Sequence, residues 1–315
     1  MLTHMVILLD DTSVSYCYYA NNSKKHRLIS LEDLKSGIRW AMKENLHIQF
    51  VYPDYSLPND YLEAIETIDH TNIKPESQAD GADVIVLTNW KSSAPKVLDG
   101  AIYVLRANSC ELQNHIDYIR SLMAKASKIA IVLTDTEAFS DKDIPTYQTI
   151  LEELSKHLCD AYQSGNAVQV NLLTDRIMLN EMNNCDAGIN NITLAPNGGF
   201  YLCPAFYYDN PEENNIGNLR HGLTIKNRQL LRLNHAPICR NCDAYHCRRC
   251  VWLNCKLTLD YNTPSHQQCV IAHIERNVSQ QLQKRLQESN IQLSPNFEIK
   301  EIDYLDPFNK YSKWK

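Results

Sequence analysis

The sequence predicts an α/β protein, with a parallel β-sheet and helices in residues 1–176 followed by a small cysteine-rich domain built around metal. Two observations support this prediction. Short apolar runs alternate with segments of helical periodicity up to about residue 176, and eight of the 11 cysteines then lie between residues 185 and 269. Repeated strand–helix units favour parallel strands, because a crossover helix returns the chain to the same edge of the sheet. Periodicity alone leaves open whether the sheet curves into a partial barrel or is doubly wound.

Six apolar runs are predicted to be buried parallel strands. Each is short and rich in branched side chains, which is typical of strands covered on both faces. They are Met5–Leu9, Ile48–Tyr52, Asp83–Leu87, Ala101–Leu105, Ile129–Leu133 and Val168–Leu172.

Helix signals lie between these runs. Ser30 can cap a helix together with Asp33, and Asn59 is the expected cap of the next helix. The predicted helices cover residues 30–42, 59–68, 111–125 and 141–162. A further polar helix is expected over residues 273–288, and the remainder to Lys315 is expected to be extended.

Composition narrows the function. The net charge is −6 and the 31 Lys and Arg residues are scattered, which argues against nucleic acid or an anionic membrane as a partner. No apolar stretch is long enough to span a bilayer, and the N-terminal apolar run is too short for a signal peptide, so we expect a cytoplasmic protein. A reducing cytosol leaves thiolates available for metal. Of the cysteines outside the cysteine-rich stretch, Cys110 and Cys159 are expected to be small buried residues.

The cysteine spacing predicts a metal-binding module. Cys185 is followed by 12 residues, Gly198, four residues and a second cysteine; a C-x2-C-x4-C-x2-C-x4-C run and a distal cysteine come later. Pairs separated by two residues let thiolates converge on one metal centre. On spacing alone, zinc and iron–sulfur are equally supported. The candidate ligands are Cys185, Cys203, Cys239, Cys242, Cys247, Cys250, Cys255 and Cys269.

Other side chains accompany these thiols. Gly198 and Gly199 separate two alternating runs, which predicts a hairpin that returns Cys203 alongside Cys185. The cations Arg248, Arg249 and Lys256 would offset the negative charge of a thiolate-bound cluster, although a solvated basic loop explains them equally well. The histidines His246 and His266 are expected to support the site, or to lie on the surface, more than to bind metal.

The cysteine order, together with the segment Ile216-Gly217-Asn218-Leu219, resembles the SPASM domain of radical S-adenosylmethionine (SAM) enzymes that mature peptides. The resemblance covers roughly residues 185–275 and implies two [4Fe–4S] clusters with interleaved ligands. One set is Cys185, Cys203 and Cys250 or Cys255; the other is Cys239, Cys242, Cys247 and Cys269. This chain departs from the family in two ways. Within the cysteine run, successive cysteines are separated by four and then two intervening residues, where the family has five and then three. Cys255 is an additional cysteine. Three ligands in the first set would leave one iron open.

The same resemblance directs attention to the N-terminus. Radical SAM enzymes place C-x3-C-x2-C after their first strand, and the matching positions here are Asp10, Val14 and Cys17. The family's Gly-Gly-Glu-Pro motif after the second strand is replaced by Pro53-Asp-Tyr-Ser56. The resemblance therefore implies a partial (β/α) barrel that has lost its SAM chemistry.

Residues 239–254 and 262–269 most resemble the CXXX repeat peptide maturase family. That resemblance implies an accessory maturase for a ribosomally synthesised cysteine-repeat peptide, working with a partner radical SAM enzyme. It gives a degenerate barrel over residues 1–176, an iron–sulfur domain over 177–275 and a C-terminal helix and tail over 276–315. The alternatives are a zinc-stapled binding or scaffold protein without redox activity and, less favoured, an independent SAM enzyme.

Overall fold

The computed structural model describes residues 2–91, 96–293 and 299, and the chain forms two compact units. The first unit comprises residues 1–88 and 186–235, and the second comprises residues 89–185 and 236–315. Both contain parallel strands and helices, so the predicted α/β class is confirmed. The predicted domain boundaries near residues 176 and 275 stay predictions. The extended tail expected up to Lys315 lies outside the described residues.

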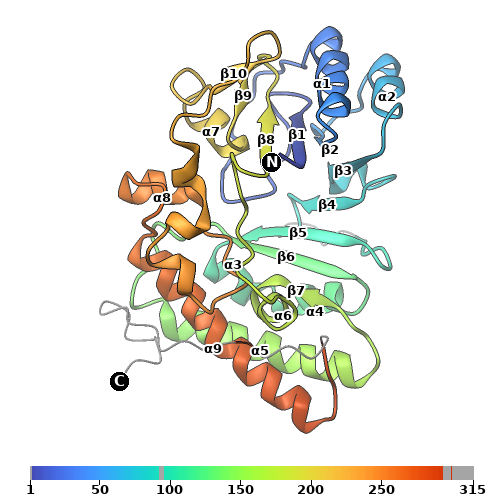
Figure 1. The fold of residues 1–315 in the computed structure, drawn as a ribbon. Coiled ribbons are helices and arrows are strands. Elements are labelled where there is room, and N and C mark those ends of the chain that lie inside the picture. The colour runs from blue at the N-terminus through green and yellow to red at the C-terminus, as the bar shows by residue number, and fades with distance from the viewer. Residues whose placement is uncertain (1, 92–95, 294–298, 300–315) are drawn as a thin grey trace. The chain divides into compact units, whose positions relative to one another are not determined.

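In the described part of the first unit, six strands form a sheet in the order β4-β3-β2-β1-β8-β9. Neighbours are parallel except for β8 and β9, which form the predicted hairpin with Gly198 at φ 75°. The strands are β1 (His4–Leu8), β2 (His47–Val51), β3 (His70–Pro75), β4 (Val84–Leu87), β8 (Asn191–Leu194) and β9 (Phe200–Tyr201). The other elements are α1 (Leu31–Lys43), α2 (Asn59–Ile65), α7 (Pro204–Asp209), the pair β10 (Gly217–Asn218) and β11 (Gly222–Leu223), and 3-10 turns at Glu76–Gln78, Arg228–Leu231 and Leu233–His235 (Figure 1).

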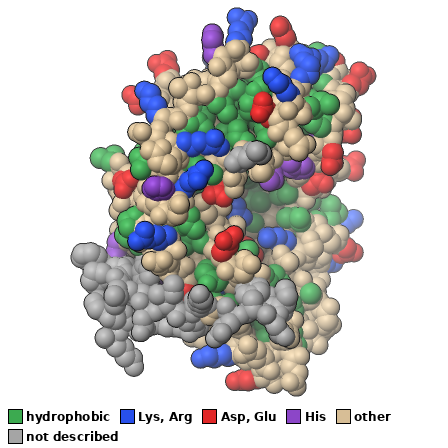
Figure 2. Space-filling model, viewed as in Figure 1, with side chains coloured by type: hydrophobic (Ala, Val, Ile, Leu, Met, Phe, Trp, Pro, Cys, Tyr) green, Lys and Arg blue, Asp and Glu red, His purple; other side chains and the backbone are tan. Residues whose placement is uncertain are grey.

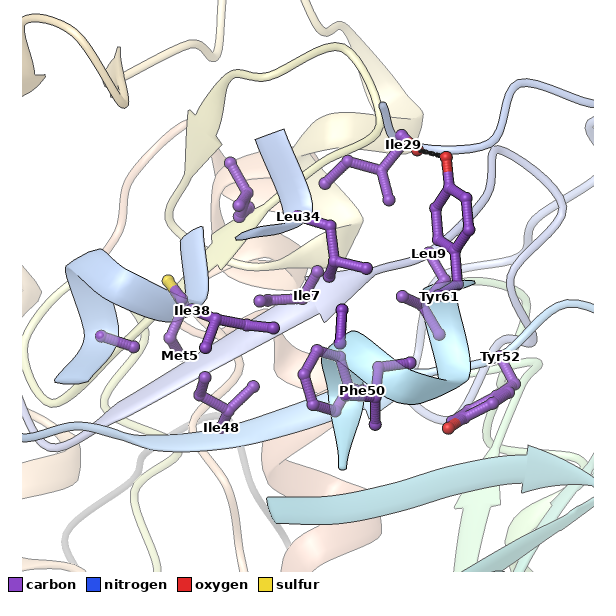
Figure 3. Packing of buried hydrophobic residues seen from close by; sticks show 14 of the residues in the cluster. Met5, Ile7, Leu9, Ile29, Leu34, Ile38, Ile48, Phe50, Tyr52 and Tyr61 are labelled. Atoms are coloured by element: carbon purple, nitrogen blue, oxygen red, sulfur yellow. Dashed lines mark hydrogen bonds between the residues drawn. The ribbon is translucent and has the colours of Figure 1, made fainter. Parts of the chain in front are cut away.

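The core of the first unit packs helix α1 against the sheet (Figure 3). Ile7 of β1 lies in register with Phe50 of β2, and both are fully buried with Leu34 of α1. Each such side chain contributes roughly 1.5–3 kcal/mol through burial. Gly37 faces the sheet, where an added β-carbon would lie 2.6 Å from Leu194 Cδ2. The glycine therefore lets the helix approach the strands closely.

Two helix starts test the predicted caps. Ser30 Oγ accepts a hydrogen bond from the Asp33 N–H at 3.0 Å, so the predicted cap of α1 is confirmed. The predicted cap at Asn59 is wrong, because Pro58 occupies the cap position and makes no side-chain bond. Proline suits the start of a helix because it has no N–H that needs a partner there.

Within residues 96–185 and 236–293 of the second unit, three parallel strands are ordered β5-β6-β7. They are β5 (Ile102–Ala107), β6 (Lys128–Leu133) and β7 (Gln169–Val170). The helices are α3 (Ser109–Asn114), α4 (Ile116–Met123), α5 (Ile144–Gln163), α6 (Asn171–Met178), α8 (Val251–Thr258) and α9 (His266–Glu288), with a 3-10 turn at Cys239–Asn241. Helix α9 packs against α5 and α6 (Figure 1).

Three predicted elements of the second unit differ from the structure. The expected strand at residues 168–172 ends at Val170, and α6 begins at once with apolar residues at helical spacing. The expected helix at residues 111–125 is divided at His115, whose φ of −124° is not helical. The C-terminal helix begins at His266, seven residues early, because Ser265 and Gln268 form a capping box.

The surface in Figure 2 carries Lys, Arg, Asp and Glu side chains interspersed, as the scattered charges of the sequence predict. Across the described residues, no helix combines the length and apolar character needed to cross a bilayer.

Candidate metal centre

The cysteine-rich loop of the second unit folds into consecutive tight turns. The Cys242 N–H donates to the Cys239 carbonyl at 3.0 Å, and the Cys247 N–H donates to the Ala244 carbonyl at 2.9 Å. Helix α8 then begins directly after Cys250. The first of these turns spans the two-residue spacer between Cys239 and Cys242, and the second ends at Cys247.

Backbone N–H groups point at three of the sulfurs. The Ala244 N–H donates to Cys242 Sγ and the Leu253 N–H donates to Cys250 Sγ, both at 3.5 Å. The Arg249 N–H donates to the Cys247 sulfur. A neutral thiol is a weak acceptor, whereas a metal-bound thiolate uses such donors to spread its negative charge. The loop is therefore arranged for thiolate ligands.

Burial controls the protonation of these thiols. It raises the pKa of Cys239 and of Cys242 to about 12, and that of Cys247 to about 11. Proximity adds to the effect of burial: Cys247 raises the pKa of Cys239 and of Cys242, and Cys185 raises the pKa of Cys247. Desolvated thiols of this kind hold their protons unless a cation stabilises the thiolate. A bound metal centre would supply that cation.

Cys185 reaches the loop through backbone pairing. Its N–H donates to the Arg248 carbonyl at 3.1 Å, and the Asn183 N–H donates to the Tyr245 carbonyl at 2.7 Å. The structure thus places Cys185 beside the loop that carries Cys239, Cys242 and Cys247. Sequence reasoning had assigned Cys185 to the other ligand set.

The remaining predicted ligands lie on nearby or separate elements. Cys255 lies within α8 and Cys269 lies in the first turn of α9, whereas Cys203 belongs to the first unit, just before α7. Outside the predicted site, Cys110 is exposed, so its expected burial is wrong, and Cys159 is partly buried. The short helix α3 buries Ser109 and Leu112 and leaves the side chain of Cys110 in solvent.

The candidate ligands suit a metal by the chemistry of their donor atoms. Among the residues that the structure describes, no three His, Cys, Asp or Glu side chains lie close enough together to hold a single ion. The thiols, their burial and the N–H donors at sulfur all suit a thiolate-ligated centre.

Helix α9 braces the loop with residues that the sequence analysis did not single out. His273 Nε2 lies 3.7 Å from Cys242 Sγ, and burial lowers the pKa of His273 to about 3. His246 Nε2 lies 3.1 Å from Glu275 Oε2, which places this histidine against α9. His273 follows Cys269 by four residues on one helix, and this spacing could have revealed it.

A buried ion triad anchors the same loop. Asp243 Oδ1 accepts from Arg276 Nη1 at 3.0 Å, and its Oδ2 lies 3.4 Å from Arg176 Nη2. All three side chains are fully buried. The segment directly after Cys242 is therefore held to both α6 and α9.

The loop after β1 holds the positions matched to C-x3-C-x2-C. Asp10 is fully buried, and its carboxylate accepts from the Thr12 N–H at 2.8 Å, from Thr12 Oγ1 at 2.6 Å and from the Tyr55 hydroxyl at 2.9 Å. Val14 is 8% exposed and apolar. Cys17 is partly buried and is the one thiol among the three positions.

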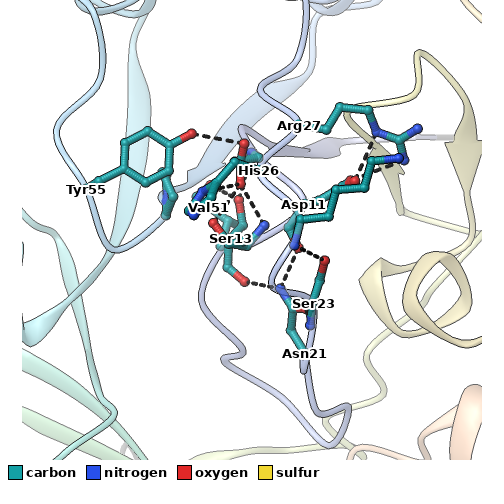
Figure 4. Close-up of polar contacts among 12 residues, drawn as sticks. Asp11, Ser13, Asn21, Ser23, His26, Arg27, Val51 and Tyr55 are labelled. Carbon is teal, nitrogen blue, oxygen red and sulfur yellow. Dashed lines mark hydrogen bonds and ion pairs between the residues drawn. The ribbon is translucent and has the colours of Figure 1, made fainter.

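Neighbouring side chains close this loop (Figure 4). Arg27 Nε lies 2.9 Å from Asp11 Oδ2, and the Tyr207 hydroxyl also donates to Asp11. Asn21 Nδ2 donates to the carbonyls of Asp11 and Ser13, each at 2.8 Å. The loop is thus held by a polar network, and Asp10 and Val14 stand at two of the three positions that the sequence analysis matched to the C-x3-C-x2-C motif.

Comparison with known proteins identifies the class of fold. No protein-family model and no curated protein sequence matches this chain. Solved structures match over 92% of this chain, and the likeness confirms the predicted α/β fold with a mostly parallel sheet.

Three of the matching structures are forms of one protein. Native anSMEcpe with bound AdoMet and Cp18Cys peptide has a TM-score of 0.61 at 12% identity, covering 92% of this chain and 99% of its own. The same protein with the Kp18Cys peptide gives 0.60 at 13% identity, with 91% and 99% covered. A hexahistidine-tagged form with AdoMet gives 0.54 at 14% identity, with 92% and 100% covered. At these identities the likeness establishes the fold.

Proposed function

We propose that this protein is an iron–sulfur accessory maturase for a ribosomally synthesised cysteine-repeat peptide. In this proposal it acts in the cytoplasm with a partner radical SAM enzyme and does not cleave SAM itself. It carries two [4Fe–4S] clusters on the two predicted cysteine sets. When bound, such clusters would supply electron transfer or an iron site for a substrate thiolate.

The loop after β1 carries the proposal. A SAM-binding cluster in the resembling family needs three thiolates, and this loop offers Cys17 alone. The Asp10 carboxylate is committed to three hydrogen bonds, and Val14 has no donor atom. The fold likeness to a protein solved with AdoMet and a peptide supports the peptide-maturation part of the proposal.

The second unit offers a donor set that suits an iron–sulfur cluster. Three sulfurs, those of Cys242, Cys247 and Cys250, accept backbone N–H groups. Such donors stabilise metal-bound thiolates and help to set the reduction potential of a cluster. A zinc ion with four thiolates carries the same net charge as an oxidised [4Fe–4S] cluster with four thiolates, so metal and sulfide analysis decides between the two.

The test is anaerobic reconstitution followed by iron, sulfide and SAM-cleavage measurements. We expect Cys242→Ser and Cys247→Ser to lower the iron content, because each removes a buried ligand. Cys17→Ser is the matched control and should leave the iron content unchanged. Loss of iron in Cys17→Ser, or SAM cleavage by the isolated chain, would overturn the accessory role.

Binding of the substrate peptide is tested separately. A synthetic peptide with repeated Cys-x-x-x units should bind the reconstituted protein more tightly than its serine analogue, because a thiolate can reach iron and a hydroxyl cannot. Equal binding of both peptides would contradict a thiol-directed site.

A further inference from the structure

Arg249 is an arginine in an unusual place. It lies between Cys247 and Cys250, is 2% exposed and has a φ of 41°. A non-glycine residue in the left-handed region costs on the order of 1 kcal/mol, and burying a guanidinium costs more. Arg249 therefore carries both of these destabilising contributions inside the cysteine-rich loop.

Its side chain is fixed by two neutral amides. Arg249 Nε donates to Asn184 Oδ1 at 2.9 Å, and Nη1 donates to Asn262 Oδ1 at 3.1 Å. Asn184 directly precedes Cys185, and Asn262 lies in the connection between α8 and α9. Amide acceptors orient the guanidinium fork without adding negative charge to it.

Arg249 lies close to the candidate ligands in the chain and in the fold. It stands two residues after Cys247 and directly before Cys250, and its Nε partner Asn184 directly precedes Cys185. Its own backbone N–H also donates to the Cys247 sulfur. One residue therefore presents both a dipole and a full positive charge to the same group of ligands.

We propose that Arg249 is a positioning residue that raises the reduction potential of the cluster held by Cys239, Cys242 and Cys247. The inference rests on the proposed function. A buried positive charge favours the reduced cluster, which carries one more electron, and the two asparagines hold that charge in place. At an effective dielectric constant of ~20, one unit charge about 10 Å from the cluster changes the reduction equilibrium on the order of tenfold, and a closer charge changes it more.

The experiment first measures iron and sulfide in every variant and then titrates the midpoint potential anaerobically by visible absorbance and EPR. In Arg249→Gln we expect the equilibrium constant for reduction to fall on the order of tenfold, or about 59 mV for one electron. Arg249→Lys keeps the charge and should retain most of the potential. Arg240→Gln removes an exposed cation from the same run and should change it little.

Asn262→Asp provides a second test in case Arg249→Gln does not take up its cluster. It keeps Arg249 and its hydrogen bond but sets a carboxylate against the guanidinium, so the potential should fall as in Arg249→Gln. A wild-type potential in fully loaded Asn262→Asp and Arg249→Gln would overturn the inference while leaving the proposed function intact. Absence of iron and sulfide from the wild-type protein would overturn both.

Discussion

Replacing Asp243 with asparagine should destabilise the second unit strongly. The carboxylate is fully buried between two fully buried guanidiniums, 3.0 Å from Arg276 Nη1 and 3.4 Å from Arg176 Nη2. Asparagine has the same shape, but it removes the negative charge of the acid and can turn an amide donor toward a guanidinium donor. Two positive charges would then lie in the interior with their shared partner lost.

The magnitude follows from this burial. Removing one partner of a buried ion pair costs about 3–5 kcal/mol, whereas the total stability of a domain is about 5–15 kcal/mol. The assay is urea unfolding of metal-free, reduced protein, followed by far-UV circular dichroism, with hydrogen exchange of α9 as the local probe.

Asp117→Asn is the control, because Asp117 pairs with Arg120 on an exposed surface of α4. An exposed pair contributes little, so this variant should unfold at the wild-type urea concentration. If Asp243→Asn unfolds no earlier than Asp117→Asn, the triad does not stabilise the unit and the reasoning is wrong.

Three further changes test the other parts of the structure. Gly217→Ala should lower the free energy of unfolding by more than ~2 kcal/mol, because the new β-carbon would lie 2.0 Å from the Gly222 carbonyl oxygen. Its control Gly222→Ala meets no atom within 4 Å and should cost only about 1–2 kcal/mol for its positive φ. Equal shifts of the melting temperature in the two variants would contradict this. Ser265→Ala removes the cap of α9 and should cost about 1 kcal/mol in urea unfolding, and an unchanged midpoint would show that the cap is dispensable. Tyr55→Phe removes a 2.9 Å hydrogen bond from buried Asp10 and should cost about 1.5–3 kcal/mol, with calorimetry as the check and a wild-type melting curve as the contrary result.

Strands with a strong apolar signal could be predicted from the sequence, and those without one could not. Strand β1 and strand β6 lie within one residue of the predicted runs because their branched residues are buried between neighbours. Strand β3, with the sequence His-Thr-Asn-Ile-Lys-Pro, was missed because it contains a single branched apolar residue. Its pairing with β2 and β4 holds it in the sheet, and pairing partners are not visible in local periodicity.

The candidate site shows the same limit. Cysteine spacing predicted which loop would carry the thiols, because tight turns are a local property. The braces of that loop come from distant parts of the chain: Arg176 from α6, Glu275 and Arg276 from α9, and Asn184 beside Cys185. These contacts depend on helix packing, which local sequence does not show. The sequence therefore left two interpretations of Arg249 open, a cation that offsets cluster charge and part of a solvated basic loop.

The metal content of the anaerobically purified wild-type protein tests the central claim most directly. Elemental analysis together with acid-labile sulfide should find iron and sulfide in equal amounts, with the broad visible absorbance of [4Fe–4S] clusters. Zinc without sulfide, in a colourless protein, would contradict the account and favour a zinc-stapled scaffold.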